Sequence, residues 1–136
     1  MNHSSNSQSW GLTVLRVVVG IVFLVHGGQK LFIWGFHGIA GFLGGLGIPF
    51  PMFSGVVLTL VELLAGAALV LGLLTRWAAM LLALEMLVAI LTFHLKHGFF
   101  VPAGVEYPLM LLTANVTLLL SGPGAASVDG VIAKRD

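Results

Sequence analysis

Long apolar segments with almost no charge are the feature that most constrains the fold of this chain. Four such segments cover about residues 10–32, 52–74, 77–95 and 107–121. A helix needs roughly 20 apolar residues to cross a bilayer. Only 8% of the residues are charged, whereas a soluble domain carries about 25% because its surface faces water. The pattern therefore predicts an all-α integral membrane protein, with a four-transmembrane-helix bundle as a single domain over residues 1–136.

The segment between the first two spans, residues 33–50, is rich in glycine. It holds six glycines, and we expect residues 37–46 to form a short interfacial or re-entrant helix that ends at Gly47 and Pro49. A short polar N-terminus and a C-terminal tail flank the spans. No small-residue cleavage site follows the first apolar segment, so we expect it to stay in place as a membrane helix rather than be removed as a signal peptide.

The positions of lysine and arginine predict the orientation in the membrane. Four of these six residues would lie on the side that carries both termini, namely Arg16, Arg76, Lys134 and Arg135. Because cytoplasmic loops carry an excess of Lys and Arg, we expect both termini in the cytoplasm. The formal net charge of only +1 leaves no basic surface for nucleic acid.

Ionisable residues inside the spans are the strongest candidates for a site. Glu62 and Glu85 lie near the predicted midplane, and the long side chain of Arg16 can reach toward either carboxylate. An ionisable group there costs roughly 2.5–3.5 kcal/mol on insertion. Two interpretations stay open: a buried ion pair that only fixes the register of the helices, or a site that handles protons or a ligand. In the second, desolvation and like charge keep the surplus acid protonated.

Helical spacing places these charges on faces that also carry small residues, and such faces let membrane helices pack closely. Arg16 shares its face with Gly20, and Glu62 shares one with Gly66. In the fourth span, the corresponding face holds Glu106, Met110, Thr113 and Thr117. We expect these faces to meet at the axis of the bundle.

Histidines and lysines gather at the outer ends of the spans: His26, Lys30, His94, Lys96 and His97. Zinc or iron needs three or four converging ligands, and the lysines would repel a cation, so no metal site is predicted. No spacing supports a haem between two of the histidines. Ordinary interfacial residues, or a site for an anion or lipid headgroup, are the favoured interpretations. The absence of cysteine excludes thiol redox chemistry.

Five short motifs in one order resemble the DoxX family of small four-helix bacterial membrane proteins. They are L-R-x-x-x-G at residues 15–20, G-x-x-K at 27–30, L-G-I-P at 46–49, E-x-x-x-G followed by G-L-L-T-R within 62–76, and G-P-G-A-x-S-x-D at 122–129. Relatives often have Ser-Leu-Asp near the end, where this chain has Ser-Val-Asp. The resemblance implies a place in the bacterial plasma (inner) membrane and a link to quinone chemistry or oxidative stress, since members are labelled oxidoreductases or redox-associated subunits.

The leading hypothesis is an accessory subunit or small-ligand binder in redox metabolism, with a quinone as the possible ligand. Arg16 would donate a hydrogen bond to one quinone carbonyl, Glu62 or Glu85 would supply a proton, and Phe23 would contact the ring. His26 and Lys30, at the outer mouth of the site, are the other two candidate ligand-binding residues besides Arg16 and Phe23. The alternative is a non-catalytic scaffold or assembly partner of a redox complex, and a homo-oligomer is compatible with both. A transporter is less favoured because the chain lacks clear internal repeats.

Overall fold

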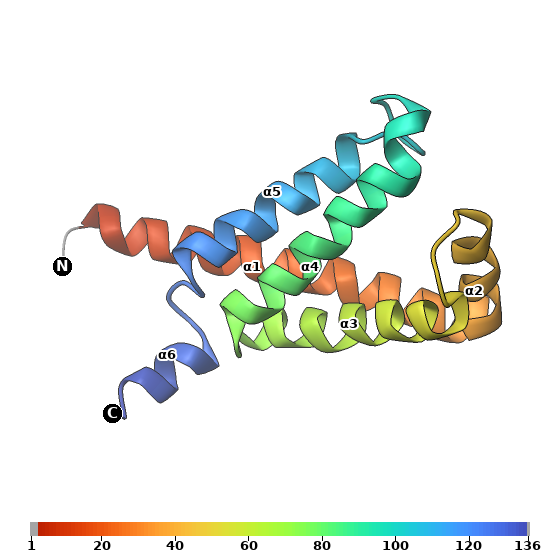
Figure 1. Cartoon of the computed structure of the whole chain (residues 1–136). Coiled ribbons are helices and arrows are strands. Elements are labelled where there is room, and N and C mark those ends of the chain that lie inside the picture. The colour runs from red at the N-terminus through yellow and green to blue at the C-terminus, as the bar shows by residue number, and fades with distance from the viewer. Residues whose placement is uncertain (1–2, 136) are drawn as a thin grey trace.

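The computed structural model describes residues 3–135, and every regular element among them is a helix (Figure 1). The long helices are α1 (His3–Gln29), α3 (Pro51–Leu71), α4 (Thr75–Ala89) and α5 (Glu106–Ser121). The shorter elements are the α-helices α2 (Gly35–Gly45) and α6 (Val128–Ala133), the π-helical turns η1 (Lys30–Trp34) and η2 (Ile90–His94), and the 3-10 turn η3 (Leu95–His97). The prediction of an all-α protein is therefore confirmed.

Three helical stretches among the described residues are long and apolar enough to cross a membrane. They are His3–Gly45, Pro51–Leu71 and Thr75–His97. The helix α5 is shorter, at 16 residues. The first helix begins at His3 rather than at residue 10. Large apolar side chains cover the outside of these helices, with Leu64 and Leu84 exposed by 69% and 53%. Such a surface is suited to contact with lipid rather than water.

The glycine-rich segment after the first span forms the helix α2, which lies beside the start of α3 (Figure 1). The chain changes direction at Gly35, whose φ of 71° lies in the left-handed region that glycine adopts without steric cost. Close packing of α2 on α3 requires Gly55, because a Cβ there would lie 3.1 Å from the side chain of Ile39.

The helices α1 and α3 touch backbone to backbone. A Cβ at Gly20 would lie 2.8 Å from the carbonyl oxygen of Gly66, and one at Gly66 would lie 2.9 Å from the amide nitrogen of Leu24. No larger residue fits at either position without separating the helices. This contact confirms that the predicted faces of the first two spans meet, and it follows the small-residue rule for membrane helices.

The second pair of helices, α4 and α5, packs through a different face of α5 from the predicted one. Met110 is 69% exposed and Thr113 is also exposed, so the expectation that these residues face the bundle axis is wrong. The inward residues are Pro108, Asn115 and Leu118. These three residues also follow helical spacing, but only Asn115 among them is polar. The sequence analysis chose the inward face by its polar residues, so it did not identify this one.

The two helix pairs diverge toward the end of the molecule that carries α2 (Figure 1). At the opposite end lie both termini and α6, and the apolar core packs between the pairs there. That core includes Val19, Phe23, Leu69, Ala79, Leu82 and Leu118. At the diverging end, residues of α1, α2, α3, α4 and α5 line a cavity.

Residues 125–129 close the core end, and we call this segment the C-terminal clamp. The amide of Ala125 donates to the hydroxyl oxygen of Thr13, at 2.9 Å. The carboxylate of Asp129 accepts hydrogen bonds from the amides of Leu74 and Thr75, at 2.7 and 2.9 Å. These two amides belong to the unpaired donors at the start of α4, so Asp129 caps that helix from outside it.

Candidate functional site

Arg16 does not reach the glutamates, and the predicted ion pair is wrong. Its side chain is 1% exposed and extends to the clamp end, where its guanidinium donates to the carbonyls of Leu69 and Val70, at 2.9 and 3.3 Å, and to that of Ala126. The carbonyls in the last turn of a helix have no partner within the helix. They accept from Arg16, and the negative charge of Asp129 also attracts the guanidinium.

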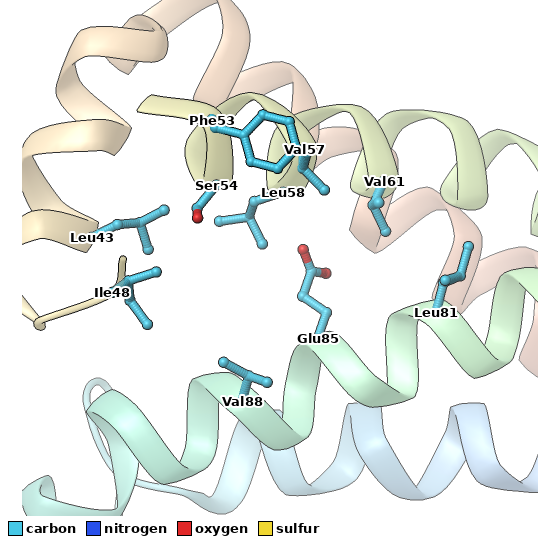
Figure 2. Close-up of a pocket in the computed structure, with 10 residues that line it drawn as sticks. All are labelled: Leu43, Ile48, Phe53, Ser54, Val57, Leu58, Val61, Leu81, Glu85 and Val88. Atoms are coloured by element: carbon cyan, nitrogen blue, oxygen red, sulfur yellow. The ribbon is translucent and has the colours of Figure 1, made fainter. Parts of the chain in front are cut away.

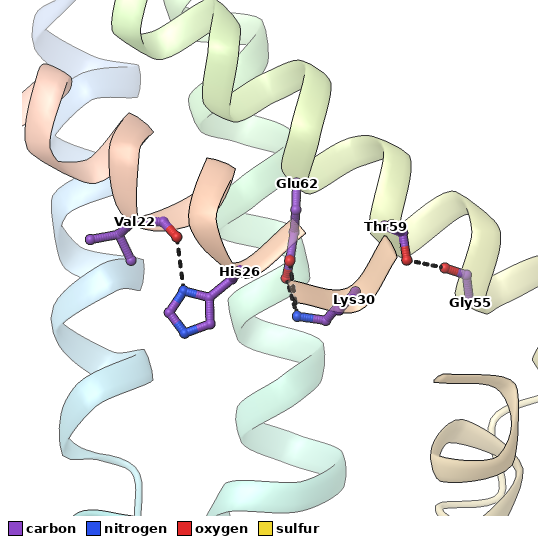
Figure 3. Close-up of polar contacts among 6 residues, drawn as sticks. All are labelled: Val22, His26, Lys30, Gly55, Thr59 and Glu62. Atoms are coloured by element: carbon purple, nitrogen blue, oxygen red, sulfur yellow. Dashed lines mark hydrogen bonds and ion pairs between the residues drawn. The ribbon is translucent and has the colours of Figure 1, made fainter. Parts of the chain in front are cut away.

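The partner of Glu62 is Lys30. The sequence analysis expected Lys30 at the outer mouth of the site and not beside a glutamate of the interior. The ammonium of Lys30 lies 3.0 and 2.9 Å from the two carboxylate oxygens of Glu62 (Figure 3). Both side chains are largely shielded, at 16% and 4% exposure. Lys30 is the first residue of the π-helical turn η1, and the ion pair joins this turn to the middle of α3.

Glu85 differs from Glu62 because no residue of the described chain donates a hydrogen bond to its carboxylate. Both oxygens are buried. The side chain reaches from α4 into the space between α3 and α4 (Figure 2). Its carboxyl group interacts electrostatically with Glu62 and Lys30, and it lies close enough to Glu62 to share a hydrogen bond if one of the two acids is protonated.

These three residues line a cavity of about 480 Å³ between the diverging helix pairs. Most of the predicted site residues are brought together there: Phe23, His26, Lys30, Glu62 and Glu85. Arg16 does not line it. The volume is within the range of small-molecule sites, about 300–1,000 Å³. Apolar side chains make up most of the wall, and the charged groups are confined to one region of it.

Aromatic contacts connect the elements on either side of this cavity. Phe42 of α2 meets Phe93 of η2 edge to face, with ring centroids 5.4 Å apart. The rings of His26 and Tyr107 join α1 to α5, at 6.2 Å. All four residues line the cavity. Phe42, Phe93 and Tyr107 were missed by the sequence analysis, because aromatic residues at the end of a span are usually interfacial anchors.

The two π-helical turns, η1 and η2, both border the cavity. Lys30 and Trp34 line it from η1, and Thr92 and His94 line it from η2. A π-turn widens the helix locally and occurs frequently at functional sites. Nothing in the sequence pattern signalled either turn.

Two histidines on the wall are held by backbone carbonyls through Nδ1. His26 pairs with the carbonyl of Val22 and His94 with that of Ala103, each at 2.8 Å (Figure 3 shows the first). Because a carbonyl only accepts, each contact requires the proton on Nδ1, and Nε2 of a neutral ring is then an acceptor. Within residues 3–135, no group of three or more His, Asp or Glu is arranged to hold a metal ion.

Comparisons with known proteins agree with the motifs. The profile of the DoxX family matches residues 11–95. The chain is 35% identical over 124 residues to a Bacillus subtilis protein named "Putative oxidoreductase CatD", across 91% of this chain and 88% of that one. It is 29% identical over 126 residues to the inner membrane protein YphA of Escherichia coli, across 87% of each chain. No solved structure matches.

Proposed function

This chain belongs to the DoxX family of membrane proteins, and we propose that its cavity binds the head of a lipid-soluble carbonyl compound of the quinone class. The single observation that carries the proposal is the carboxyl group of Glu85. It is buried in an apolar cavity without a hydrogen-bond donor, beside the complete ion pair of Lys30 and Glu62. A buried polar group without a partner is costly, and in its protonated form the Glu85 carboxyl group would donate a hydrogen bond to a carbonyl oxygen of the ligand.

The proposed placement in the membrane makes α5 the fourth span and α2 an interfacial or re-entrant helix at the outer surface. At 1.5 Å per residue α3 is about 30 Å long, which matches the hydrocarbon core. Exposed aromatic residues stand near both ends of the bundle, with Trp10 and Trp77 at the clamp end and Phe32, Phe50 and Phe100 at the cavity end. Both termini would face the cytoplasm of a bacterial inner membrane, as the loop charges predict.

In the proposed complex Lys30 takes the role that the sequence suggested for Arg16. Its ammonium would donate to one quinone carbonyl while it stays paired with Glu62. Glu85, or the proton that it shares with Glu62, would donate to the other carbonyl. Three ionised groups would leave one net negative charge in the membrane, so retaining one proton on the two acids is the less costly state. Phe23 would contact the ring, and His26 would border it.

The proposal places the chain in redox metabolism or the oxidative-stress response as a ligand-binding subunit. Reduction of a quinone to a quinol consumes two electrons and two protons. The acids and histidines of the cavity can supply protons. The chain has no cysteine, so the electrons would come from another molecule, such as a redox partner protein. The word oxidoreductase in the name of the Bacillus subtilis relative is compatible with either an enzyme or a subunit of one.

A matched pair of ligands tests the proposal. Menadione carries two ring carbonyls, and 2-methylnaphthalene has the same ring without them. Menadione should raise the melting temperature of the purified protein, since binding to the folded state alone adds about 2.7 kcal/mol at 100 times Kd. The hydrocarbon should not. Equal shifts, or none, would exclude the quinone site.

Variants then assign the role of Glu85. Glu85→Leu should weaken menadione binding by about tenfold, because one hydrogen bond to the ligand is lost. Glu85→Gln keeps a donor and should spare most binding, while it abolishes any quinone-dependent activity because it holds no transferable proton. Glu106→Gln is the control, since Glu106 lies outside the cavity and should leave both properties unchanged.

A scaffold function is the second candidate, and one observation favours it. The ion pair of Lys30 and Glu62 is complete without a ligand, so these charges could serve only to hold α1 against α3. If menadione and 2-methylnaphthalene behave alike, we would infer that the chain is an assembly partner within a larger membrane complex.

A further inference from the structure

A second hollow lies on the other side of Glu85, between α3 and α4 (Figure 2). Its volume is about 320 Å³, and among the described residues Glu85 is the one ionisable residue that lines it. Within the same part of the chain, the only other polar lining residue is Ser54, whose hydroxyl already donates to the carbonyl of Pro49, at 2.8 Å. The rest of the wall is aliphatic or aromatic, so this groove offers contacts to an apolar group along its whole length.

The groove opens on the outer surface of the helices. Several of its lining residues are also strongly exposed there: Phe53 by 72%, Val57 by 42%, Leu81 by 44% and Val88 by 51%. Because α3 and α4 are membrane spans by length and composition, this surface faces lipid chains. An apolar group can therefore enter the groove from the bilayer without passing through water.

The groove and the cavity share part of their walls. Five residues line both hollows: Leu43, Ile48, Leu58, Glu85 and Val88. Glu85 is thus the polar group at the junction, with an apolar opening to lipid on one side and the pair of Lys30 and Glu62 on the other. The two hollows are therefore direct neighbours, with Glu85 between them.

We propose that the groove between α3 and α4 holds the apolar chain of the ligand whose head occupies the cavity. The inference rests on the proposed function and narrows it to amphipathic lipids, with a flat carbonyl head and a long hydrocarbon tail, that enter sideways from the bilayer. The remaining sides of the cavity include His26, Gln29 and His94. A tail directed past them would leave the apolar surroundings, so the groove is the favourable exit.

Blocking the groove tests where the tail lies. Val57→Trp fills it from α3, and Leu64→Trp is the matched control because Leu64 is exposed on the same helix but lines neither hollow. Binding is measured for ubiquinone-0, which has no tail, and for decylubiquinone, which has the same head with a ten-carbon chain. Val57→Trp should weaken decylubiquinone by about tenfold and ubiquinone-0 by less than about twofold, because the bulk displaces only the chain. Leu64→Trp should change neither.

The outcomes separate the two proposals. If the wild type binds neither quinone, the proposed function fails and the inference fails with it. If it binds both, and Val57→Trp behaves like Leu64→Trp, the head site stands and the tail does not lie in the groove.

A second measurement avoids dependence on the folding of the variant. A decyl quinone with a diazirine at the end of its chain is photolysed on the wild-type protein, and the attached residues are mapped by mass spectrometry. Labels on Phe53, Val57 or Leu81 that excess decylubiquinone removes support the inference. Labels near Gln29 or His94 instead would overturn it.

Discussion

The two ends of the bundle differ in how the protein satisfies a shielded charged group. At the clamp end, Arg16 donates to three backbone carbonyls and Asp129 accepts from two backbone amides. At the cavity end, Glu85 has no donor among the described residues. Burial in a membrane span is therefore not enough to indicate function. A charge that the protein itself satisfies stabilises the fold, whereas an unsatisfied one beside a cavity is available to a ligand.

Removing the cation at the cavity end should have the largest effect on stability. Lys30→Met leaves Glu62 buried without its partner, and breaking such a pair costs roughly 3–5 kcal/mol. Unfolding of the purified protein in mild detergent would measure the loss. The second change Glu62→Gln should restore part of it by removing the unpaired charge. A double variant no more stable than Lys30→Met would contradict the ion pair.

At the clamp end, Arg16→Met should lower the free energy of unfolding by about 3 kcal/mol, because hydrogen bonds from a charged donor to buried carbonyls are lost. Since Arg16 and Glu62 share no contact, adding Glu62→Gln should give an additive loss rather than a rescue. If Glu62→Gln instead restores stability to Arg16→Met, the two ends are energetically coupled, and the contrast drawn between them is wrong.

A smaller effect is expected for the carboxylate of the C-terminal clamp. Asp129→Ala removes the cap of α4 and should cost about 0.5–2 kcal/mol, the usual range for a lost helix cap. Asp129→Asn keeps an acceptor and should lose less. The melting temperatures of the two variants provide the measurement, and equal losses would mean that the charge rather than the hydrogen bonds stabilises the helix.

The smallest effect on stability should come from Glu85. Glu85→Leu removes a carboxyl that makes no hydrogen bond in the described structure, so the free energy of unfolding should stay within about 1 kcal/mol of the wild type or rise. Thermal unfolding without ligand would test this. A loss comparable with that of Lys30→Met would show that Glu85 is structural and would remove the contrast between the two ends.

The sequence predicted the class of the fold and the charged part of the cavity wall, and it failed where the helices are irregular. Apolar segment length identified the three stretches of the described chain that can cross a membrane. Glu62 and Glu85 were correctly expected in the interior, because charges in spans face inward. Helical spacing also placed Gly20 and Gly66 on faces that were expected to meet, and the two glycines do so. These are local properties of regular helices.

The errors have one cause in common. The spacing of residues along one helix does not show which residues of other segments pack against it. Arg16 was paired with a glutamate because the last turn of α3 and the segment around Ala126 were not known to approach it. Lys30 was placed at the outer mouth because it lies near the end of the first apolar segment, but its side chain extends to Glu62 in the middle of α3. The groove beside Val57 arises from the mutual position of α3 and α4, which periodicity does not contain.

The contact between Arg16 and Ala126 also bears on how the chain is made. These residues are 110 positions apart, and ribosomes add roughly 5–20 residues per second. Arg16 is therefore synthesised about 5–20 s before the carbonyl of Ala126 exists, and the carbonyls of Leu69 and Val70 also follow it. During this interval the first helix carries a cation that lacks its full set of partners, which is complete only once residue 126 has been made.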